Sequence, residues 1–206
     1  MNPLQYAVSE IFYSLQGEGY WSGKPAIFVR MAGCNLRCPF CDTDFSTTET
    51  LHPPELLERI REAVIRYNTT FVVWTGGEPT YQPIHQIVHD LRRKLHAKYG
   101  RVYQAIETNG TLILPIVNWV TLSPKKGSNV ILRRAEELKI VLGSGVDPKD
   151  WEDFPATYKW IQPMWTPEEE QLPVGQRPNV KAALDYVLSN PKWRLSLQCH
   201  KLLNIR

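Results

Sequence analysis

Three of the four cysteines in the chain lie close together, at Cys34, Cys38 and Cys41. Three thiolates can hold three irons of a cubane iron-sulfur cluster and leave the fourth iron open for a ligand that is not part of the protein. Two alternatives stay open at this point. Cys199 could complete a set of four thiolates, or the three cysteines could bind zinc together with a histidine such as His52 or His200. The spacing therefore predicts a metal centre in a loop over residues 33–43.

The composition fits a single domain over residues 1–206, since 43% of the residues are hydrophobic and the length suits one full core. A net charge of +3 with scattered Lys and Arg predicts no nucleic-acid partner and no membrane partner. No apolar run approaches the roughly 18 residues of a spanning helix, and no secretory signal opens the chain. We therefore expect a cytoplasmic protein, in which clustered cysteines favour metal or redox chemistry over disulfides.

Helical periodicity marks three segments, each beginning beside a proline: Pro53–Tyr67, Pro83–Tyr99 and Val180–Leu188. Short runs rich in β-branched and aromatic residues predict strands, which outnumber the helices about two to one. These strands are Ala26–Met31, Phe71–Trp74, Val102–Ile106, Val117–Leu122, Leu138–Leu142, Thr157–Ile161 and Arg194–Leu197, with Ala7–Tyr13 a weaker candidate. The order predicts parallel crossovers in the first half of the chain and loop connections in the second.

Unusual polar motifs follow six of these strands. They are Gly33-Cys34, Thr75-Gly76-Gly77-Glu78, Glu107-Thr108-Asn109-Gly110, Ser123-Pro124-Lys125, Gln162-Pro163 and Gln198-Cys199-His200. Any one of them could be an ordinary turn, because Gly, Pro, Asn and Ser dominate turns. Carboxyl ends of parallel strands meet on one rim, where barrel-like α/β sheets place their active sites. We predict an α/β fold, a barrel-like sheet of about six parallel strands with three main helices.

The cysteine spacing, with Phe40 before the third cysteine and Gly-Gly-Glu-Pro after the next strand, resembles the radical S-adenosylmethionine (SAM) superfamily. The resemblance implies that SAM chelates the open iron of a 4Fe-4S cluster and yields a 5'-deoxyadenosyl radical. It also implies a SAM site made of Phe40, Asp42, Gly76, Gly77, Glu78, Ser123, Pro124, Lys125, Gln162 and Pro163. Glycines allow close backbone approach, and Ser123 and Lys125 offer a hydroxyl and a cation. Lys125 beside Lys126 could instead be a solvated pair, and Gln162-Pro163 a plain strand end.

Further stretches narrow the resemblance to one family. Phe12–Gly19, Ala26–Cys34 and Cys41-Asp42-Thr43 look like 7-carboxy-7-deazaguanine synthase, and the likeness runs from about residue 9 to Lys201. That family trims the superfamily barrel to a partial (β/α) barrel. The resemblance implies conversion of 6-carboxy-5,6,7,8-tetrahydropterin to 7-carboxy-7-deazaguanine with loss of ammonia, on the route to deazapurines such as queuosine. It further implies that SAM is regenerated and that Mg²⁺ assists, with Thr43 at the magnesium position.

The substrate-binding residues that we predict are Leu15, Gln16, Gly17, Glu18, Arg30, Thr75, Gln198, His200 and Arg206. Arg30 offers a planar fork for a carboxylate, and Glu18 with the nearby backbone suits the amidine-like edge of a pterin. The family implies that a tail over residues 198–206 closes on the substrate, with the terminal carboxylate of Arg206 near the metal or the pterin. Alternation along the last strand predicts that Cys199 is a buried small hydrophobe.

Two competing hypotheses remain beside the synthase: a glycyl-radical-activating enzyme, and a non-catalytic iron-sulfur or zinc protein. An activating enzyme needs a surface for a protein partner, whereas a carrier has no use for the Gly-Gly-Glu motif. Reduced flavodoxin or ferredoxin is the electron donor usual for such clusters. The family implies a homodimer, and five tryptophans of the second half suit either an interface or a core: Trp119, Trp151, Trp160, Trp165 and Trp193.

Overall fold

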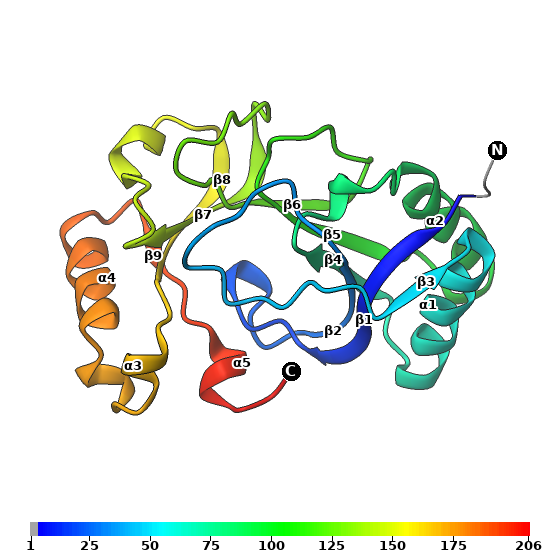
Figure 1. Ribbon diagram of the computed structural model, residues 1–206, viewed down its shortest axis with the longest axis horizontal. Helices are drawn as coiled ribbons and strands as arrows, with labels where there is room; N and C mark the ends of the chain where they lie inside the picture. The colour runs from blue at the N-terminus through cyan, green and yellow to red at the C-terminus, as the bar shows by residue number, and fades with distance from the viewer. Residues whose placement is uncertain (1–3) are drawn as a thin grey trace.

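The computed structural model describes residues 4–206, apart from the side chains of residues 96–99. Over this range a mixed sheet of nine strands runs in the order β3-β1-β2-β4-β5-β6-β7-β8-β9 (Figure 1). The strands are β1 Tyr6–Leu15, β2 Pro25–Met31, β3 Glu49–Leu51, β4 Phe71–Gly76, β5 Tyr103–Thr108, β6 Trp119–Leu122, β7 Ala135–Leu142, β8 Ala156–Pro163 and β9 Arg194–Leu195. Each pairing from β2 to β9 is parallel, whereas β1 pairs antiparallel with both β2 and β3. The predicted partial barrel of parallel strands is confirmed.

The three predicted helices are present as α1 Pro53–Tyr67, α2 His85–Tyr99 and α4 Pro178–Ser189. Two single-turn helices, α3 Pro167–Glu170 and α5 Cys199–Leu202, were not predicted, because four residues are too few to show periodicity. Short 3₁₀ turns complete the described elements: η1 Gly19–Trp21, η2 Pro79–Tyr81, η3 Pro148–Trp151 and η4 Val174–Gln176. No described helix combines the length and the apolar character needed to cross a bilayer.

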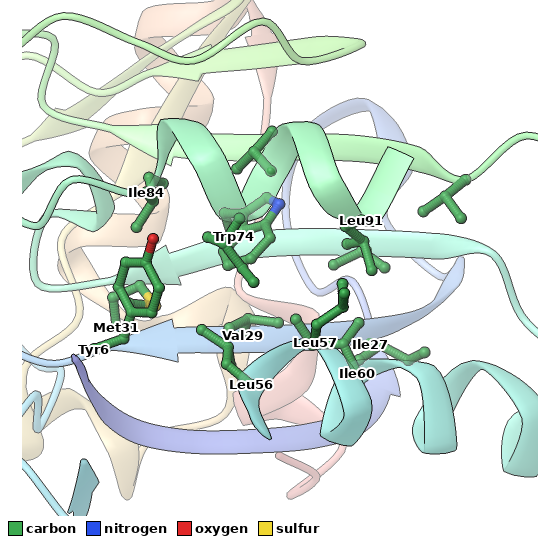
Figure 2. Close-up of a cluster of buried hydrophobic side chains, with 14 of the residues drawn as sticks. Tyr6, Ile27, Val29, Met31, Leu56, Leu57, Ile60, Trp74, Ile84 and Leu91 are labelled. Atoms are coloured by element: carbon green, nitrogen blue, oxygen red, sulfur yellow. The ribbon is translucent and has the colours of Figure 1, made fainter. Parts of the chain in front are cut away.

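The main core lies between α1, α2 and the outer face of the sheet. Figure 2 shows Leu56 and Ile60 of α1 and Leu91 of α2 against Val29 of β2 and Trp74 of β4. All five side chains are fully buried. Alternation along each strand sends the intervening side chains to the opposite face, the inside of the partial barrel. The helices therefore hold the strands in register while the inner face stays available for polar groups.

Three features differ from the sequence prediction. The weaker candidate strand is the ten-residue β1, while β3 was missed because three residues carry too short a pattern. The last strand stops at Leu195, so the interpretation of Cys199 by strand alternation was wrong. Cys199 begins α5 and is half-buried, with its Sγ accepting a hydrogen bond from the Ser22 hydroxyl at 3.5 Å. Of the five tryptophans for which an interface and a core stayed open, Trp160 and Trp193 are buried in the core, and the other three are half-buried.

Candidate active site

A cavity of about 980 Å³ opens at the carboxyl ends of the parallel strands. All six strand-end motifs contribute to its wall, and β7 adds Lys139 and Val141. Figure 1 shows α5 and the C-terminal end close to the open side of the sheet, between α3 and β1. Ligand pockets for single small molecules span about 300–1,000 Å³, so this volume lies at the upper end of that range. Every predicted site residue lines the cavity except Glu78 and Pro124.

The loop over residues 33–43, called the cluster loop below, is held by backbone and amide contacts. The Glu78 N–H donates to the Gly33 carbonyl at 3.0 Å, and the Gly33 N–H donates to the Phe45 carbonyl at 3.0 Å. Farther along, the Asn109 amide donates to the Asn35 side-chain oxygen at 3.0 Å. The loops after β4 and β5 therefore position the cluster loop, which has no regular structure of its own.

Cys34, Cys38 and Cys41 all line the cavity, and none forms a disulfide. The Cys41 N–H donates to the Cys38 carbonyl at 3.1 Å, so the loop turns between the second and third thiols. Among the described residues no three His, Cys, Asp or Glu side chains converge on a single point as ligands of one ion do. The thiolates of a cubane cluster bind different irons and need no such convergence, so the donor set fits a 4Fe-4S cluster with one open iron.

Glu78 does not reach the cavity, so its predicted contact with SAM is corrected to a structural role. Its buried carboxylate accepts hydrogen bonds from the Thr108 hydroxyl at 2.9 Å and the Asn109 N–H at 2.7 Å. It also accepts from the Thr80 N–H at 3.2 Å. Pro124 is likewise buried, between two cavity-lining neighbours in the chain. Both residues position groups that face the cavity.

Lys125 extends into the cavity from the loop after β6. Its ammonium donates to the Ser123 hydroxyl at 2.7 Å and to the Ser123 carbonyl at 3.0 Å. Burial, reinforced by the charge of Lys139, lowers the pKa of Lys125. Two cations that share one cavity make an anionic ligand favourable there. A solvated surface pair with Lys126 is therefore wrong for Lys125, while Lys126 itself is exposed.

Glu18 forms a buried ion pair with Lys139, which sequence reasoning had missed. The Lys139 ammonium contacts Oε2 of Glu18, while Oε1 accepts from Gln162 Nε2 at 3.1 Å and from Gln198 Nε2 at 2.9 Å. Burial by itself raises the pKa of Glu18, but the charge and hydrogen bond of Lys139 outweigh it and lower that pKa to about 2. Glu18 is therefore an anion that connects β7, β8 and the tail.

A second carboxylate, Glu107, lies one residue before the end of β5 and lines the same cavity. It accepts from Gln16 Nε2 at 3.0 Å and from the Thr75 hydroxyl at 2.8 Å. Both donors were predicted to bind substrate, and here their side chains orient Glu107. The charge of Glu107 also raises the pKa of Lys139 against the opposing effect of burial. Glu18 and Glu107 therefore share the electrostatic influence of one lysine.

The tail over residues 198–206 lies at the cavity, and Gln198, His200, Lys201 and Arg206 are part of its wall. The Cys199 N–H donates to the Gly17 carbonyl at 2.9 Å. Gly17 leaves room for His200, since a Cβ there would lie 2.1 Å from Nδ1 of the imidazole. Lys201 contacts the Asp42 carboxylate and lies 3.9 Å from the Trp165 ring centroid. Asp42, the residue after Cys41, therefore anchors the tail to the cluster loop.

Arg30 lies at the rim of the cavity beside Glu10. Its Nε donates to Glu10 Oε1 at 2.8 Å, and Arg206 Nη1 is 3.7 Å from Glu10 Oε2. A main-chain oxygen of Arg206 accepts a hydrogen bond from the Ser14 hydroxyl. Glu10 therefore holds two arginines of the predicted site near each other. Thr43 also lines the cavity, one residue before Asp44.

The missed residues that line the cavity include Glu10, Glu107, Asn109, Lys139 and Lys201. Lys139 carried a usable signal, because a charged residue is unusual inside a strand that is buried on both faces. Glu107 belonged to a recognised strand-end motif but had no predicted role. Nothing local distinguishes Lys201 from a surface lysine.

A family model described as the radical SAM superfamily matches residues 28–136. The 7-carboxy-7-deazaguanine synthase of Bacteroides thetaiotaomicron is 40% identical over 200 residues, which cover 97% of this chain and 98% of that protein. The chain belongs to the 7-carboxy-7-deazaguanine synthase family. The synthase of Bradyrhizobium diazoefficiens is 39% identical over 98% of this chain and 100% of its own. The crystal structure of QueE from Escherichia coli superposes with a TM-score of 0.68 at 27% identity and covers 95% of both chains.

Membership in the 7-carboxy-7-deazaguanine synthase family decides between the three hypotheses. The chain is a radical SAM lyase of 7-deazapurine biosynthesis, whose cofactors are a 4Fe-4S cluster and SAM. Neither a glycyl-radical-activating enzyme nor a zinc or carrier protein accounts for similarity over nearly the whole length. His52 is also no candidate for a zinc ligand, because it is the N-cap of α1 and its Nδ1 lies 3.2 Å from the Leu4 carbonyl oxygen.

Proposed function

We propose that this enzyme converts 6-carboxy-5,6,7,8-tetrahydropterin to 7-carboxy-7-deazaguanine with loss of ammonia, on the route to queuosine. The observation that carries the proposal is the shared cavity, which is lined by three thiols, by the carboxyl groups of Glu18 and Glu107, and by the tail. The similarity to synthases of that name over nearly the whole chain supports it. When bound, the cluster and SAM supply the 5'-deoxyadenosyl radical that abstracts hydrogen from C6 of the pterin.

On the SAM side, we assign the cluster to Cys34, Cys38 and Cys41. The SAM-binding residues are those predicted ones that line the cavity: Phe40, Asp42, Gly76, Gly77, Ser123, Lys125, Gln162 and Pro163. Lys125 supplies a half-buried cation for the SAM carboxylate, and Ser123 fixes its position. Asp42 orders the cluster loop through its contact with Lys201.

On the substrate side, Glu18 and Glu107 offer acceptors to the N–H edge of the pterin, and Arg30 offers donors to its carboxylate. Gln198 and His200 lie on the tail, where they cover the ligand from the open side and reduce its contact with water. The remaining substrate residues are Leu15, Gln16, Gly17, Thr75 and Arg206. Gln16 and Thr75 act through Glu107, which they orient.

Thr43 is our proposed magnesium residue. Its place in the cavity wall at the end of the cluster loop supports the assignment, since Mg²⁺ usually keeps several waters and takes few protein ligands. Thr43→Ala should weaken the magnesium dependence of turnover and leave the iron content unchanged. If the magnesium response of Thr43→Ala equals that of the unmodified enzyme, the metal binds elsewhere.

The decisive experiment is anaerobic reconstitution of the cluster, followed by incubation with reductant, SAM, Mg²⁺ and the carboxy-tetrahydropterin. We expect 7-carboxy-7-deazaguanine by mass spectrometry, and no product from Cys38→Ala. A reconstituted cluster that cleaves SAM without forming this product would refute the substrate assignment.

For the remaining properties we propose one domain over residues 1–206, a homodimer, a cytoplasmic location and reduced flavodoxin or ferredoxin as electron donor. A small-molecule substrate and an external electron follow from the radical SAM chemistry of the family. An oxygen-sensitive cluster with reduced thiolates suits a reducing compartment. Sedimentation of the reconstituted enzyme tests the dimer, and turnover with each reduced donor tests the partner.

A further inference from the structure

Lys139 is the least expected charge in the molecule, because it lies within β7 and its side chain is only 8% exposed. The proposed reaction gives it no role in binding SAM or in moving a hydrogen. We propose that Lys139 is a specificity-determining residue, which holds Glu18 as a carboxylate so that the cavity accepts a 2-amino-4-oxopyrimidine ring and rejects a 2-oxo ring. This inference rests on the proposed pterin substrate and assigns a new residue to its recognition.

The contacts of Glu18 support this role because Lys139, Gln162 and Gln198, which all contact its carboxylate, are donors. Lys139 occupies Oε2, and the amides of Gln162 and Gln198 occupy Oε1 at 3.1 and 2.9 Å. An ammonium has no lone pair to accept a proton from a neutral carboxylic acid. Three elements of the fold therefore hold Glu18 in the form that only accepts hydrogen bonds.

The charges around Lys139 act in the same direction. Glu18, Glu107 and Glu137 all stabilise its ammonium, which keeps Lys139 charged despite burial. Glu137 is engaged in other hydrogen bonds, since its carboxylate accepts from the Tyr20 N–H at 2.7 Å and from the Thr121 hydroxyl at 3.1 Å. His200, on the tail, adds a further positive influence on Glu18. Of the three carboxylates, Glu18 and Glu107 line the cavity.

Two carboxyl groups that line one cavity, Glu18 and Glu107, select a ligand by the hydrogen-bonding groups along its edge. A pterin presents a ring N–H beside a 2-amino group, which are two adjacent donors for which Glu18 and Glu107 offer acceptors. A lumazine, with oxygen at the 2-position, presents a carbonyl there and meets a carboxylate with like partial charge. A site whose buried polar group is left unpaired rejects the analogue, and one hydrogen bond to a charged group is worth roughly tenfold or more in affinity.

The test measures binding of two oxidised acids that cannot turn over, pterin-6-carboxylic acid and lumazine-6-carboxylic acid. Anaerobic equilibrium dialysis with the reconstituted enzyme and SAM gives both dissociation constants. We expect the unmodified enzyme to prefer the pterin by about tenfold or more, and Lys139→Met to reduce the preference to about threefold or less. Lys159→Met is the matched control. Lys159 is a half-buried lysine of the adjacent β8 that contacts the Glu152 carbonyl outside the cavity, and this variant should keep the preference of the unmodified enzyme.

A pH series distinguishes a specific effect of Lys139→Met on Glu18 from a general disturbance of the binding site. Without Lys139, burial raises the pKa of Glu18, so in Lys139→Met the pterin should bind more tightly as pH rises from about 5 to about 7. The unmodified enzyme should show no such rise. A parallel pH profile in the two proteins, or an unchanged preference in Lys139→Met, would overturn the inference.

Glu18→Gln provides the second variant, should Lys139→Met fail to fold. An amide presents a donor as well as an acceptor, so the preference should again fall to about threefold or less. A preference retained in Glu18→Gln refutes the inference. If the unmodified enzyme binds neither acid, both the proposed pterin substrate and this inference are wrong. If the enzyme binds the pterin tightly and the variants keep the same ratio of the two dissociation constants, only this inference is wrong.

Discussion

Gly77 packs directly against the backbone of Gly33, so that a Cβ on Gly77 would lie 2.2 Å from the Gly33 carbonyl oxygen. The same Cβ would lie 2.8 Å from the Cβ of Cys34. From the sequence, we predicted that this glycine allows SAM to approach the backbone closely. The structure adds a second reason, because the loop after β4 sets the position of the first cluster cysteine.

Gly77→Ala should therefore disturb the cluster loop. We expect the iron content after reconstitution to fall and the free energy of unfolding to drop by about 1–3 kcal/mol, as for an overpacked site. Gly175→Ala is the control, since nothing lies within 4 Å of a Cβ there. Iron analysis and denaturant titration of both variants check the prediction, and full iron loading of Gly77→Ala would contradict it.

Gly17→Ala should act on the tail and spare the cluster. The new methyl group would meet the His200 imidazole, and it would also lie 2.9 Å from the His200 backbone nitrogen, so side-chain rotation alone does not relieve the clash. We expect weaker binding of pterin-6-carboxylic acid by about tenfold with unchanged iron content. Equal affinity in Gly17→Ala and the unmodified enzyme would show that the tail does not hold the ligand.

Glu78→Gln should destabilise the fold, because the buried Glu78 carboxylate holds the loops after β4 and β5 together. An amide in its place turns one acceptor into a donor facing the Thr108 hydroxyl or the Asn109 N–H. We expect a loss of about 2 kcal/mol in the free energy of unfolding. Urea titration measures it, with Glu168→Gln on the short helix α3 as an exposed control. A direct SAM contact would instead weaken SAM binding without changing stability.

The Glu18–Lys139 pair should make stability depend on pH in acid. The pKa of Glu18 is about 2 in the fold and 4.5 ordinarily, so its stabilisation is complete above pH 4.5 and is lost as pH falls toward 2. The raised pKa of Lys139 keeps its contribution present below 10.5. Thermal melts should show a deficit of Lys139→Met against the unmodified enzyme that is constant from about pH 7 to about pH 9, where Glu18 is ionised in both proteins, and that shrinks from about pH 7 toward about pH 3. A deficit that does not change with pH would mean that packing of the lysine stem is what matters.

Local patterns were enough for most of the strands and for the three long helices, because each depends on a few neighbouring residues. The strand-end motifs also predicted the cavity, since parallel strands bring their carboxyl ends to one rim. Short elements such as β3 and α5 were not predicted. Because α5 was missed, Cys199 was placed on a strand when it is the first residue of a helix. Four residues or fewer do not establish a period.

The amino-acid sequence by itself determined the chemistry that is available: three thiolates at fixed spacing, a glycine pair and the family to which they belong. Only the tertiary structure decided which polar groups act together. Glu18 and Lys139 are separated by 121 residues along the chain, and their pairing depends on the order of strands in the sheet. The strength of a charge depends on burial and on its neighbours in space, and no local pattern of residues contains either.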